Sequence, residues 1–405
     1  MFMRNTSQLR ILSKAPAGWR ICNLGAVIEN TQYGTSNASG EDGEIPVIGM
    51  KNIQDGRVTL NNLEKTHLSE TEYQSLLLRR GDILINRTNS YELVGKTGIY
   101  DSDVPAVFAS YLVRLKPDLN QVNPKYLNYW LNSPQIKKVI KKIATKAISQ
   151  ANINPTELQK FCPLLLPPLS HQDKIVSLLQ EIDTVTQKSE RLIEVKRKNY
   201  TTSLHTLLNK AKVQNQLMPL SNFLKESKLP DTDGGPHKRI TVRLWLKGLE
   251  KREVRGTEAD GATVYYKRKK GQLIYGKQNA HRGAFGIIPD HLEGYSSSQD
   301  LPAFDISGID PEWLYFCIAN DPFLTKLENY TNGSGSKRLH QSDLLRLKIP
   351  VPETTIQVKS SQLLNNLRSE IKLLERQLKL YKKEKNTILT KLLGTNIKRK
   401  EGPND

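Results

Sequence analysis

A long-period internal repeat constrains the fold of this chain more than any other feature of its sequence. The segment VNPKYLNYWLNSPQIKKVI (122–140) resembles IDPEWLYFCIANDPFLTKL (309–327), and the match places Pro124 on Pro311, at a shift of 187 residues. Self-similarity at a fixed shift is the signature of a duplicated structural unit. We therefore expect corresponding elements in the two halves of the chain.

The repeat continues beyond these segments. After a two-residue deletion the shift becomes 185, which carries Gln172 onto Gln357. GDILINR (81–87) also has a looser counterpart in GQLIYGK (271–277). A nearly constant shift over roughly 85 residues argues against a chance similarity between two basic amphipathic helices. The sequence therefore predicts two copies of one unit.

Each copy begins with a mixed, turn-rich region and ends with a long stretch that contains neither Gly nor Pro. The turn-rich regions hold short strand-like patches between Gly, Asn, Asp and Pro, which is typical of irregular β-rich domains. Asn123 and Asp310 each precede a proline, the preferred chemistry for starting a helix. We expect an α+β fold of two similar β-rich domains, separated and followed by long helices. The expected ranges are 1–168 for the first domain, 169–212 for the central helix, 213–354 for the second domain, 355–395 for the C-terminal helix and 396–405 for a basic, polar tail.

The two long helices carry apolar residues at alternating spacings of three and four, which predicts a coiled-coil seam. The stronger seam is in the second helix, where only Lys385 interrupts it. A lone helix would leave this stripe in water, so we expect the two helices to pair with each other, in antiparallel orientation. The expected seam residues are Leu179, Ile182, Ile193, Tyr200 and Leu207 in the first helix, and Leu364, Leu367, Ile371, Leu374, Leu378, Tyr381, Ile388 and Leu392 in the second.

Sixty Lys and Arg against 41 Asp and Glu give a formal net charge of +19, which favours a polyanionic partner, either nucleic acid or an acidic membrane face. No apolar run reaches the ~18 residues needed to span a bilayer, and we expect no secretory signal. The three cysteines form no CxxC and fit reduced thiols. These features argue against a membrane protein, a secreted disulfide scaffold and a fully disordered chain.

Three regions are candidates for binding nucleic acid. Residues 236–282 hold thirteen Lys and Arg against four Asp and Glu, with tyrosines interleaved. A polar loop follows GDILIN, and a GSGSKR segment (333–338) could cradle phosphate through backbone N–H groups. The alternatives are a solvated surface, an ordinary turn and a flexible linker, respectively. The candidate DNA-binding residues are Lys51, Asn86, Arg87, Thr88, Asn89, Ser90, Lys96, Lys146, Gln150, Arg239, Arg243, Lys267, Arg268, Lys270, Lys277, Arg282, Lys337 and Arg338.

Catalytic signatures are missing from the sequence. The seven histidines form no HExxH motif and no Cys/His metal spacing, and there is no GxSxG, no nuclease carboxylate motif and no (N/D)PP(F/Y) tetrapeptide. We therefore expect no catalytic residues, no metal site and no cofactor on this chain, which would act as a binder.

These features together resemble the specificity (S) subunit of type I restriction–modification enzymes. The resemblance rests on RRGDILINRTNSYELVGKTGIY (79–100), on LLLPPLSHQDKIVSLL (164–179) with LKIPVPETTIQVKSSQLL (347–364), and on the duplicated helices. It implies that two target-recognition domains read the halves of a split double-stranded DNA sequence. It also implies that the helices space these domains and dock two methyltransferase (M) subunits, joined by restriction/translocase (R) subunits, in a prokaryotic cytoplasm. S-adenosylmethionine (AdoMet) would then be bound by the methyltransferase.

The chain departs from the family pattern at two points. GQLIYGK lacks the Asp and Arg of GDILINR, and Pro-Glu replaces Pro-Pro-Leu before the second long helix. Two other function classes remain open on sequence alone. One is a stand-alone nucleic-acid-binding or architectural protein whose coiled coil self-associates, and the other is a nuclease or methyltransferase with a degenerate site.

Overall fold

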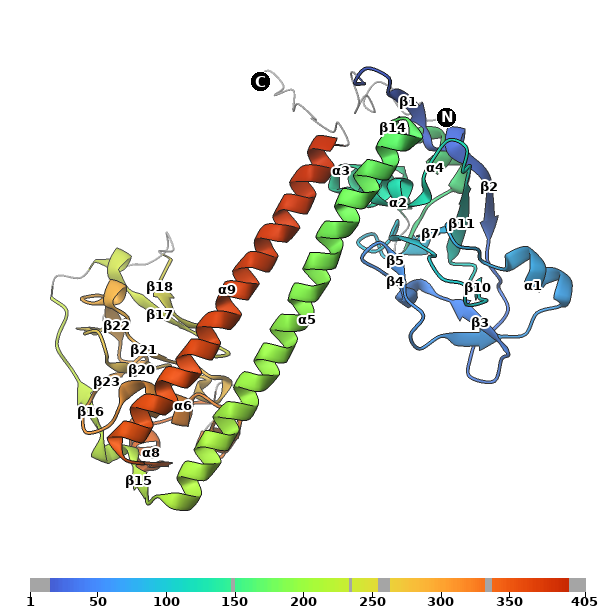
Figure 1. The fold of residues 1–405 in the computed structure, drawn as a ribbon. Helices are drawn as coiled ribbons and strands as arrows, with labels where there is room; N and C mark the ends of the chain where they lie inside the picture. Colours follow the sequence, from blue (N-terminus) through green and yellow to red (C-terminus); the bar gives the residue numbers. More distant parts are fainter. Residues whose placement is uncertain (1–14, 147–149, 233–234, 254–262, 332–336, 393–405) are drawn as a thin grey trace. The chain divides into compact units, whose positions relative to one another are not determined.

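The computed structural model describes residues 15–146, 150–232, 235–253, 263–331 and 337–392. They divide into two compact units. The first is drawn from residues up to 190 and from 376 onward, and the second from residues 191–375. Each of the two long helices thus contributes one segment to each unit (Figure 1).

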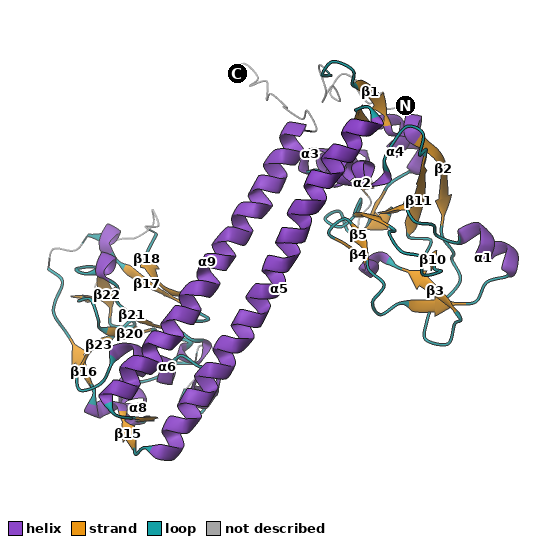
Figure 2. Ribbon diagram, in the orientation of Figure 1, coloured by secondary structure: helices purple, strands orange, loops and turns teal. Residues whose placement is uncertain are grey.

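The first unit is built around a mixed six-stranded sheet, accompanied by smaller sheets and short helices (Figure 2). In spatial order the large sheet contains β2 (Ile28–Tyr33), β11 (Leu112–Pro117), β7 (Ile83–Asn86), β9 (Thr97–Ile99), β5 (Arg57–Val58) and β4 (Ile53–Gln54). The smaller sheets are β10 (Val107–Phe108) with β3 (Ile45–Ile48) and β6 (Glu64–Thr66), β12 (Thr145–Lys146) with β13 (Ala151–Asn152) and β8 (Thr88–Asn89), and β1 (Arg20–Asn23) with β14 (Pro163–Leu166). The short helices are α1 (Glu70–Leu76), α2 (Pro124–Asn132), α3 (Pro134–Ile143) and α4 (Pro155–Phe161).

The second unit has a smaller, four-stranded antiparallel sheet at its centre. Its order is β16 (Leu224–Ser227), β23 (Ala303–Ile306), β20 (Leu273–Tyr275) and β21 (Phe285–Ile287). Three strand pairs surround it: β15 (Leu217–Pro219) with β24 (Lys348–Pro350), β17 (Ile240–Arg243) with β18 (Gly248–Lys251), and β19 (Tyr265–Lys267) with β22 (Ser296–Ser298). The short helices are α6 (Pro311–Ile318), α7 (Asp321–Glu328) and α8 (Gln341–Arg346). The expectation of an α+β fold with two β-rich regions is confirmed.

The repeat is visible in corresponding elements of the two units. GDILINR forms β7 and GQLIYGK forms β20, and each strand has neighbours on both sides in its sheet. The helices α2 and α6 begin as expected, because Asn123 and Asp310 accept hydrogen bonds from backbone N–H groups of the first turn and a proline follows each of them. The strand before each long helix, β14 or β24, pairs with the first strand of its own unit.

A buried glutamine locks the start of each long helix onto its unit. Gln172 Nε2 donates to Pro167 O at 2.8 Å, and its Oε1 accepts from Asn123 N at 2.8 Å. Gln357 repeats this arrangement, donating to Pro352 O at 2.7 Å and accepting from Asp310 N at 2.9 Å. In both amides the nitrogen and the oxygen each have a hydrogen-bond partner in a buried setting, where an unpaired polar group would be costly. The matched bonds show that the duplication extends to the connection between domain and helix.

The long helices are α5 (Leu169–Gln214) and α9 (Thr354–Leu392), and segments of the two pair within each unit. In the first unit Asp183 pairs with Lys385 and Glu190 with Lys382, so numbers rise on one helix as they fall on the other. In the second unit Lys196 pairs with Glu370, while Leu364 packs in the core with residues near the end of α5. The antiparallel pairing is therefore confirmed within each unit.

The expected seam residues differ in how deeply they are buried. Leu179, Ile193, Leu364 and Ile371 are buried, whereas Ile182, Tyr200, Leu207, Leu367, Leu374, Leu378, Tyr381 and Ile388 are half-buried. The side chain of Leu392 lies outside the described part of the chain. Apolar residues that the pattern did not select are also buried because they pack into the cores of the units, namely Ile175, Val176, Leu204, Leu208, Ala211 and Leu389. None of the described helices has an apolar stretch of the length and hydrophobicity that a bilayer requires.

Candidate nucleic-acid interface

The small sheet β12–β13–β8 contains three of the first unit's candidate DNA-binding residues, Thr88, Asn89 and Lys146. Thr88 lies opposite Asn152 and Asn89 opposite Ala151, so the polar loop after β7 lies beside the strand that follows Gln150. Lys146 lies opposite Ala151 on the other side, although its side chain is not among those described. Residues about 60 positions apart in sequence are thereby brought together in one small sheet.

Arg87 projects beside this sheet and is held by its own neighbours. Its Nε donates to Ser110 O at 3.0 Å, and its Nη1 donates to Asn152 Oδ1 at 3.4 Å. The guanidinium carbon lies 4.8 Å from the centre of the Tyr33 ring. These contacts orient the guanidinium and leave it half-buried, which suits a directed contact better than a mobile charge.

Two exposed tyrosines beside Arg87 were missed by the sequence reasoning. Tyr33, whose ring contacts the guanidinium, is 51% exposed. Tyr111 is 52% exposed, and its backbone carbonyl accepts the backbone N–H of Arg87 at 2.9 Å. Aromatic faces next to a cation suit contact with a base or sugar next to a phosphate. Both tyrosines lie at the end of a strand, since Tyr33 is the last residue of β2 and Tyr111 directly precedes β11.

Lys51 and Lys96 flank the same region. Asn89 Nδ2 contacts Met50 Sδ at 3.4 Å, which brings the segment that contains Lys51 to the polar loop. Lys51 is exposed and forms a 2.6 Å ion pair with Glu64, which lowers the pKa of that carboxyl. Lys96 is exposed, and its carbonyl accepts the backbone N–H of Asn86 at 2.8 Å. With Ser90 half-buried and Gln150 exposed, most of the first-unit candidates are accessible.

Asn86 is a correction to the candidate set. Its side chain is fully buried at the end of β7, a strand in which all four residues are buried. Neither atom of its amide group has a hydrogen-bond partner within the structure. The side chain therefore faces the interior rather than the loop surface, and it cannot contact DNA in this arrangement.

Arg268 is the second correction, and its role is structural. It is 1% exposed, and its guanidinium donates to Ser297 Oγ at 2.7 Å, Ser227 O at 2.8 Å and Leu301 O at 3.3 Å. Burial lowers its pKa to about 10, so it stays charged at neutral pH. The run KRKK (267–270) suggested a nucleic-acid contact, but Arg268, directly after β19, points into the interior of the unit.

The loop around Ala280–Arg282 brings together basic candidates of the second unit. Leu339 N donates to Lys277 O at 2.9 Å, and Asn279 N donates to Lys337 O at 2.9 Å, so the segments around 277 and 338 run side by side. Arg282 and Arg338 are exposed there, and Lys277 and Lys337 are half-buried. The candidate phosphate cradle over 333–336 lies outside the described residues.

The remaining second-unit candidates lie on the strand pairs β17–β18 and β19–β22. The Arg239 guanidinium lies 4.0 Å from the centre of the Tyr265 ring, and Lys267 is half-buried at the end of β19. Arg243 pairs with Glu250, and Lys270 pairs with Asp290 at 3.2 Å. The interleaving of basic and aromatic residues that was read from the sequence is therefore realised in contacts.

Several of these cations are already paired with carboxylates. Lys337 pairs with Glu328 at 2.5 Å, which lowers the pKa of that carboxyl, and Arg338 pairs with Asp300. Such exposed pairs contribute little to stability because solvent screens them, so a phosphate can replace the carboxylate at little cost. The paired cations therefore stay available to a polyanion.

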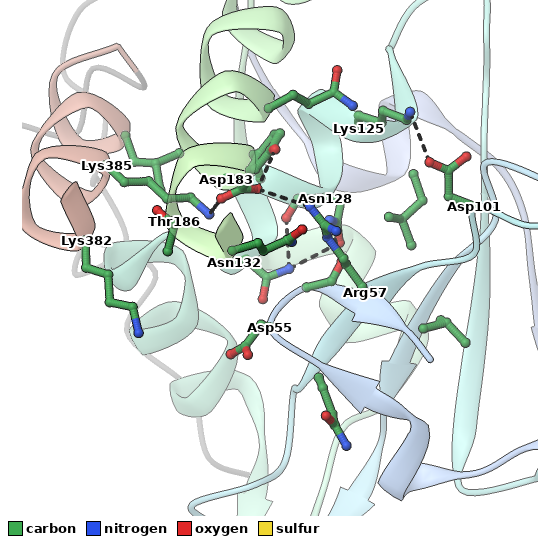
Figure 3. Close-up of a pocket in the computed structure, with 18 of the residues that line it drawn as sticks. Asp55, Arg57, Asp101, Lys125, Asn128, Asn132, Asp183, Thr186, Lys382 and Lys385 are labelled. Atoms are coloured by element: carbon green, nitrogen blue, oxygen red, sulfur yellow. Dashed lines mark hydrogen bonds and ion pairs between the residues drawn. The ribbon is translucent and has the colours of Figure 1, made fainter. Parts of the chain in front are cut away.

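The first unit also contains a polar pocket of about 760 Å³ where its β4–β5 hairpin and α2 face its segments of α5 and α9 (Figure 3). Asp183 of α5 is central. It accepts from Tyr129 Oη at 2.8 Å, pairs with Lys385 of α9 and lies 3.8 Å from Arg57 of the hairpin. Burial and the nearby Asp183 raise the pKa of Tyr129, so its hydroxyl stays protonated and donates. The network joins the recognition region to both helices of its unit.

At the corresponding place in the second unit the chemistry is different. The repeat carries Asp183 to Arg368, Tyr129 to Phe316 and Lys385 to Tyr200. Arg368 lies over aromatic rings, 5.4 Å from the Tyr315 centre and 5.6 Å from the Phe316 centre. An ionic junction in one unit is thus matched by a cation–π junction in the other.

Within the described part of the chain, no cluster of three or more His, Cys, Asp or Glu side chains is arranged to hold a metal ion. The three cysteines are free thiols, two of them buried.

The comparison with solved structures shows the fold. The S subunit of a type I restriction–modification system from M. genitalium matches 95% of this chain and 98% of its own, with a TM-score of 0.61 and 14% sequence identity. At that identity the similarity concerns the fold alone.

Sequence comparison identifies relatives that are described as type I restriction enzyme specificity subunits. The MjaX specificity subunit of Methanocaldococcus jannaschii is 28% identical over 46% of this chain and 44% of its own. The StySPI type I restriction enzyme specificity subunit of Salmonella potsdam is 27% identical over 48% and 42%. Each match therefore spans less than half of the relative. The family model of the type I restriction modification DNA specificity domain matches residues 16–197 and again 260–381. With both halves matched, the chain belongs to the type I restriction modification DNA specificity domain family.

Proposed function

We propose that this chain is the DNA sequence-specificity subunit of a type I restriction–modification complex. In this role it reads a bipartite double-stranded DNA target, one half with each unit. The observation that carries the proposal is the duplicated connection between a polar, basic recognition region and a long helix, repeated down to the hydrogen bonds of Gln172 and Gln357. Two similar reading units on paired helices suit a target with two separate halves.

The two units offer different surfaces to DNA. The first presents a compact polar sheet with Arg87 over the Tyr33 ring, and the second presents a broader set of Lys and Arg around the 280–282 segment. Phosphate contacts position a protein on DNA, whereas directed groups such as Arg and Asn read base edges. We infer that each unit contacts its own half-site through a different set of groups.

We further propose that the helices dock two methyltransferase subunits, to which restriction subunits join. On α5 the apolar residues Leu178, Val185 and Leu192 are 42–43% exposed and recur every seven residues. On α9, Leu373 and Leu380 are 62% and 57% exposed at the same spacing. A heptad stripe that the helix pair itself leaves exposed fits contact with further protein. In this proposal the partner methyltransferase binds AdoMet, and this chain has no catalytic role and needs no cofactor.

The decisive experiment compares methylomes of cells with and without this chain. A bipartite methylated-adenine motif should disappear when the chain is removed and return when it is restored, while the purified chain alone should neither methylate nor cut DNA. If the motif persists, the chain does not determine specificity. If the chain alone methylates DNA, it is an enzyme. If it binds DNA but changes no methylation, it is a stand-alone binding protein.

Arg87 provides a test of the division between the units. Arg87→Ala should relax discrimination at one half of the motif only, because a bidentate contact with guanine is worth ~1–3 kcal/mol. Arg80→Ala is the matched control, since Arg80 is exposed in the same unit and pairs with Asp101 and Asp103. The measurement is the methylated motif of each variant. Equal weakening at both halves would assign Arg87 to phosphate binding, and no change would make its loop an ordinary turn.

A further inference from the structure

A strained turn in the second unit displays a tryptophan that none of the preceding assignments uses. The antiparallel strands β17 and β18 form a hairpin that closes at the pair Arg243–Gly248 (Figure 2). Between them Trp245 has φ 63° and Leu246 has φ 54°, so two consecutive residues with side chains lie in the left-handed region. That region is disfavoured for bulky residues, and strain of this kind concentrates at functional sites.

The surrounding structure holds the turn in this conformation. Trp245 N donates to Arg282 O at 2.6 Å, and Leu246 N donates to Gly283 O at 3.0 Å. The Leu246 side chain packs toward the core of the unit, so close to Gly283 that a Cβ there would lie 3.0 Å from it. The clamp therefore packs the Leu246 side chain, half-buried, against the core and fixes the backbone that presents Trp245.

The displayed side chain is Trp245, which is 66% exposed. The other tryptophans are placed differently, because Trp130 and Trp313 are buried in the cores and Trp19 is half-buried. Burying a tryptophan ring stabilises a folded chain. This ring is instead left in water on a clamped turn, where it contributes no such stabilisation. The arrangement suits a ligand that covers the ring.

The charge around the ring indicates the class of ligand. Arg243, Lys247 and Lys251 on the hairpin are exposed, and Arg282, whose carbonyl clamps the turn, is exposed as well. Glu250 is the acidic residue within β17, the turn and β18, and it pairs with Arg243. An aromatic face between cations matches nucleic acid, in which bases with π faces lie between phosphates.

We propose that Trp245 stacks on a DNA base in the half-site bound by the second unit, while the flanking cations contact the adjacent phosphates. This inference rests on the proposed DNA-reading function and adds a specific contact to it. The ring acts as a rigid wedge because the clamped turn fixes its backbone, as apolar side chains do when they enter between base steps.

The test uses the full-length protein, a mixed-sequence 30-base-pair duplex as the base-containing probe and heparin as a polyanion without bases. The main variant is Trp245→Gly, because glycine adopts positive φ without strain and the variant should be at least as stable as the wild type. Its Kd for the duplex should be roughly 5- to 150-fold weaker, the range for losing one stacked base. Its Kd for heparin should change less than two-fold.

Trp245→Phe is the conservative variant. It keeps an aromatic face and should bind the duplex within about five-fold of the wild type. The duplex should quench the tryptophan fluorescence of the wild-type protein, and this quenching should be lost in Trp245→Phe because the remaining tryptophans are wholly or half-buried. Heparin should quench neither protein.

Three results would overturn the proposal. Duplex binding by Trp245→Gly at wild-type strength, or an equal loss of duplex and heparin binding, would show that no base is stacked. Unchanged duplex binding with a lost methyltransferase subunit would identify Trp245 as a protein-docking residue. Failure of the wild-type chain to bind the duplex better than heparin would instead contradict the proposed function, so the two failures are distinguishable.

Discussion

The junctions between recognition region and helices in the two units perform the same structural task with different chemistry. In the first unit a carboxylate, Asp183, is surrounded by Tyr129, Lys385 and Arg57. In the second a cation, Arg368, lies over aromatic rings. The corresponding positions have thus exchanged a charge of one sign for the other.

The difference shows which parts of the duplicated unit are constrained. The buried glutamine at each helix start keeps its residue type and its hydrogen bonds, because its partners are backbone groups whose positions the fold dictates. At Asp183 and Arg368, about three turns further along each helix, the partners are side chains, which can change together. An ionic network needs complete pairing, whereas a cation over aromatic rings tolerates partial exposure. The first junction should therefore be the more sensitive to substitution.

The largest expected effect comes from placing the second unit's charge in the first junction. Asp183→Arg removes the acceptor of Tyr129 and sets a cation against Lys385 and Arg57, and it should lower the free energy of unfolding of the first unit by about 3–5 kcal/mol. Urea unfolding, with hydrogen exchange of α2 as the local probe, measures the change. Glu181→Arg makes the same charge change at an exposed position of α5 and should cost less than 1 kcal/mol.

Second-unit residues at two further positions should repair part of this damage. Adding Tyr129→Phe and Lys385→Tyr to Asp183→Arg places the counterparts of Phe316 and Tyr200 beside the arginine and removes one competing cation, so part of the lost stability should return. A triple variant no more stable than the single variant would show that the two junctions are not equivalent.

A smaller loss of stability, equal in the two units, is expected when the buried glutamine at the start of each long helix is replaced. Gln172→Leu and Gln357→Leu each leave buried backbone groups unpaired and should each cost about 2–3 kcal/mol in urea unfolding. The exposed Gln180→Leu and Gln362→Leu serve as controls. Costs that differ by more than about 1 kcal/mol between the two buried glutamines would mean that the repeat is not energetically symmetric.

The smallest effect is expected at the second junction. Arg368→Met keeps most of the packing over Tyr315 and Phe316 and loses the cation–π contact, at a cost of about 1 kcal/mol. Arg376→Met, at an exposed position of α9, is the control for the loss of charge. A cost of 3 kcal/mol or more would show that this junction depends on its charge as much as the first one does.

Sequence reasoning recovered the features that depend on local chemistry. The helix starts at Asn123 and Asp310 follow from capping residues and prolines, and the long helices follow from the absence of helix breakers. The pairing of Thr88 and Asn89 in β8 with β13 could not be read from the sequence and required the structure.

The errors arose where a side chain's direction depends on tertiary packing. Arg268 stands in a run of four basic residues, and nothing local distinguishes it from its neighbours. Asn86 ends an apolar strand, and the sequence does not indicate whether that position faces the core or the loop. Trp245 was overlooked because its exposure depends on two left-handed residues without glycine, which no propensity favours.

The sequence by itself determined the duplication, the fold class and the positive charge, because each is written in residue spacing or composition. Only the tertiary structure decided which charges reach solvent, which are consumed in ion pairs or cores, and how each recognition region meets its helices. The reason is physical: repeat and helix signals act over neighbouring residues, whereas the burial of Arg268 and the network of Asp183 depend on partners from distant segments.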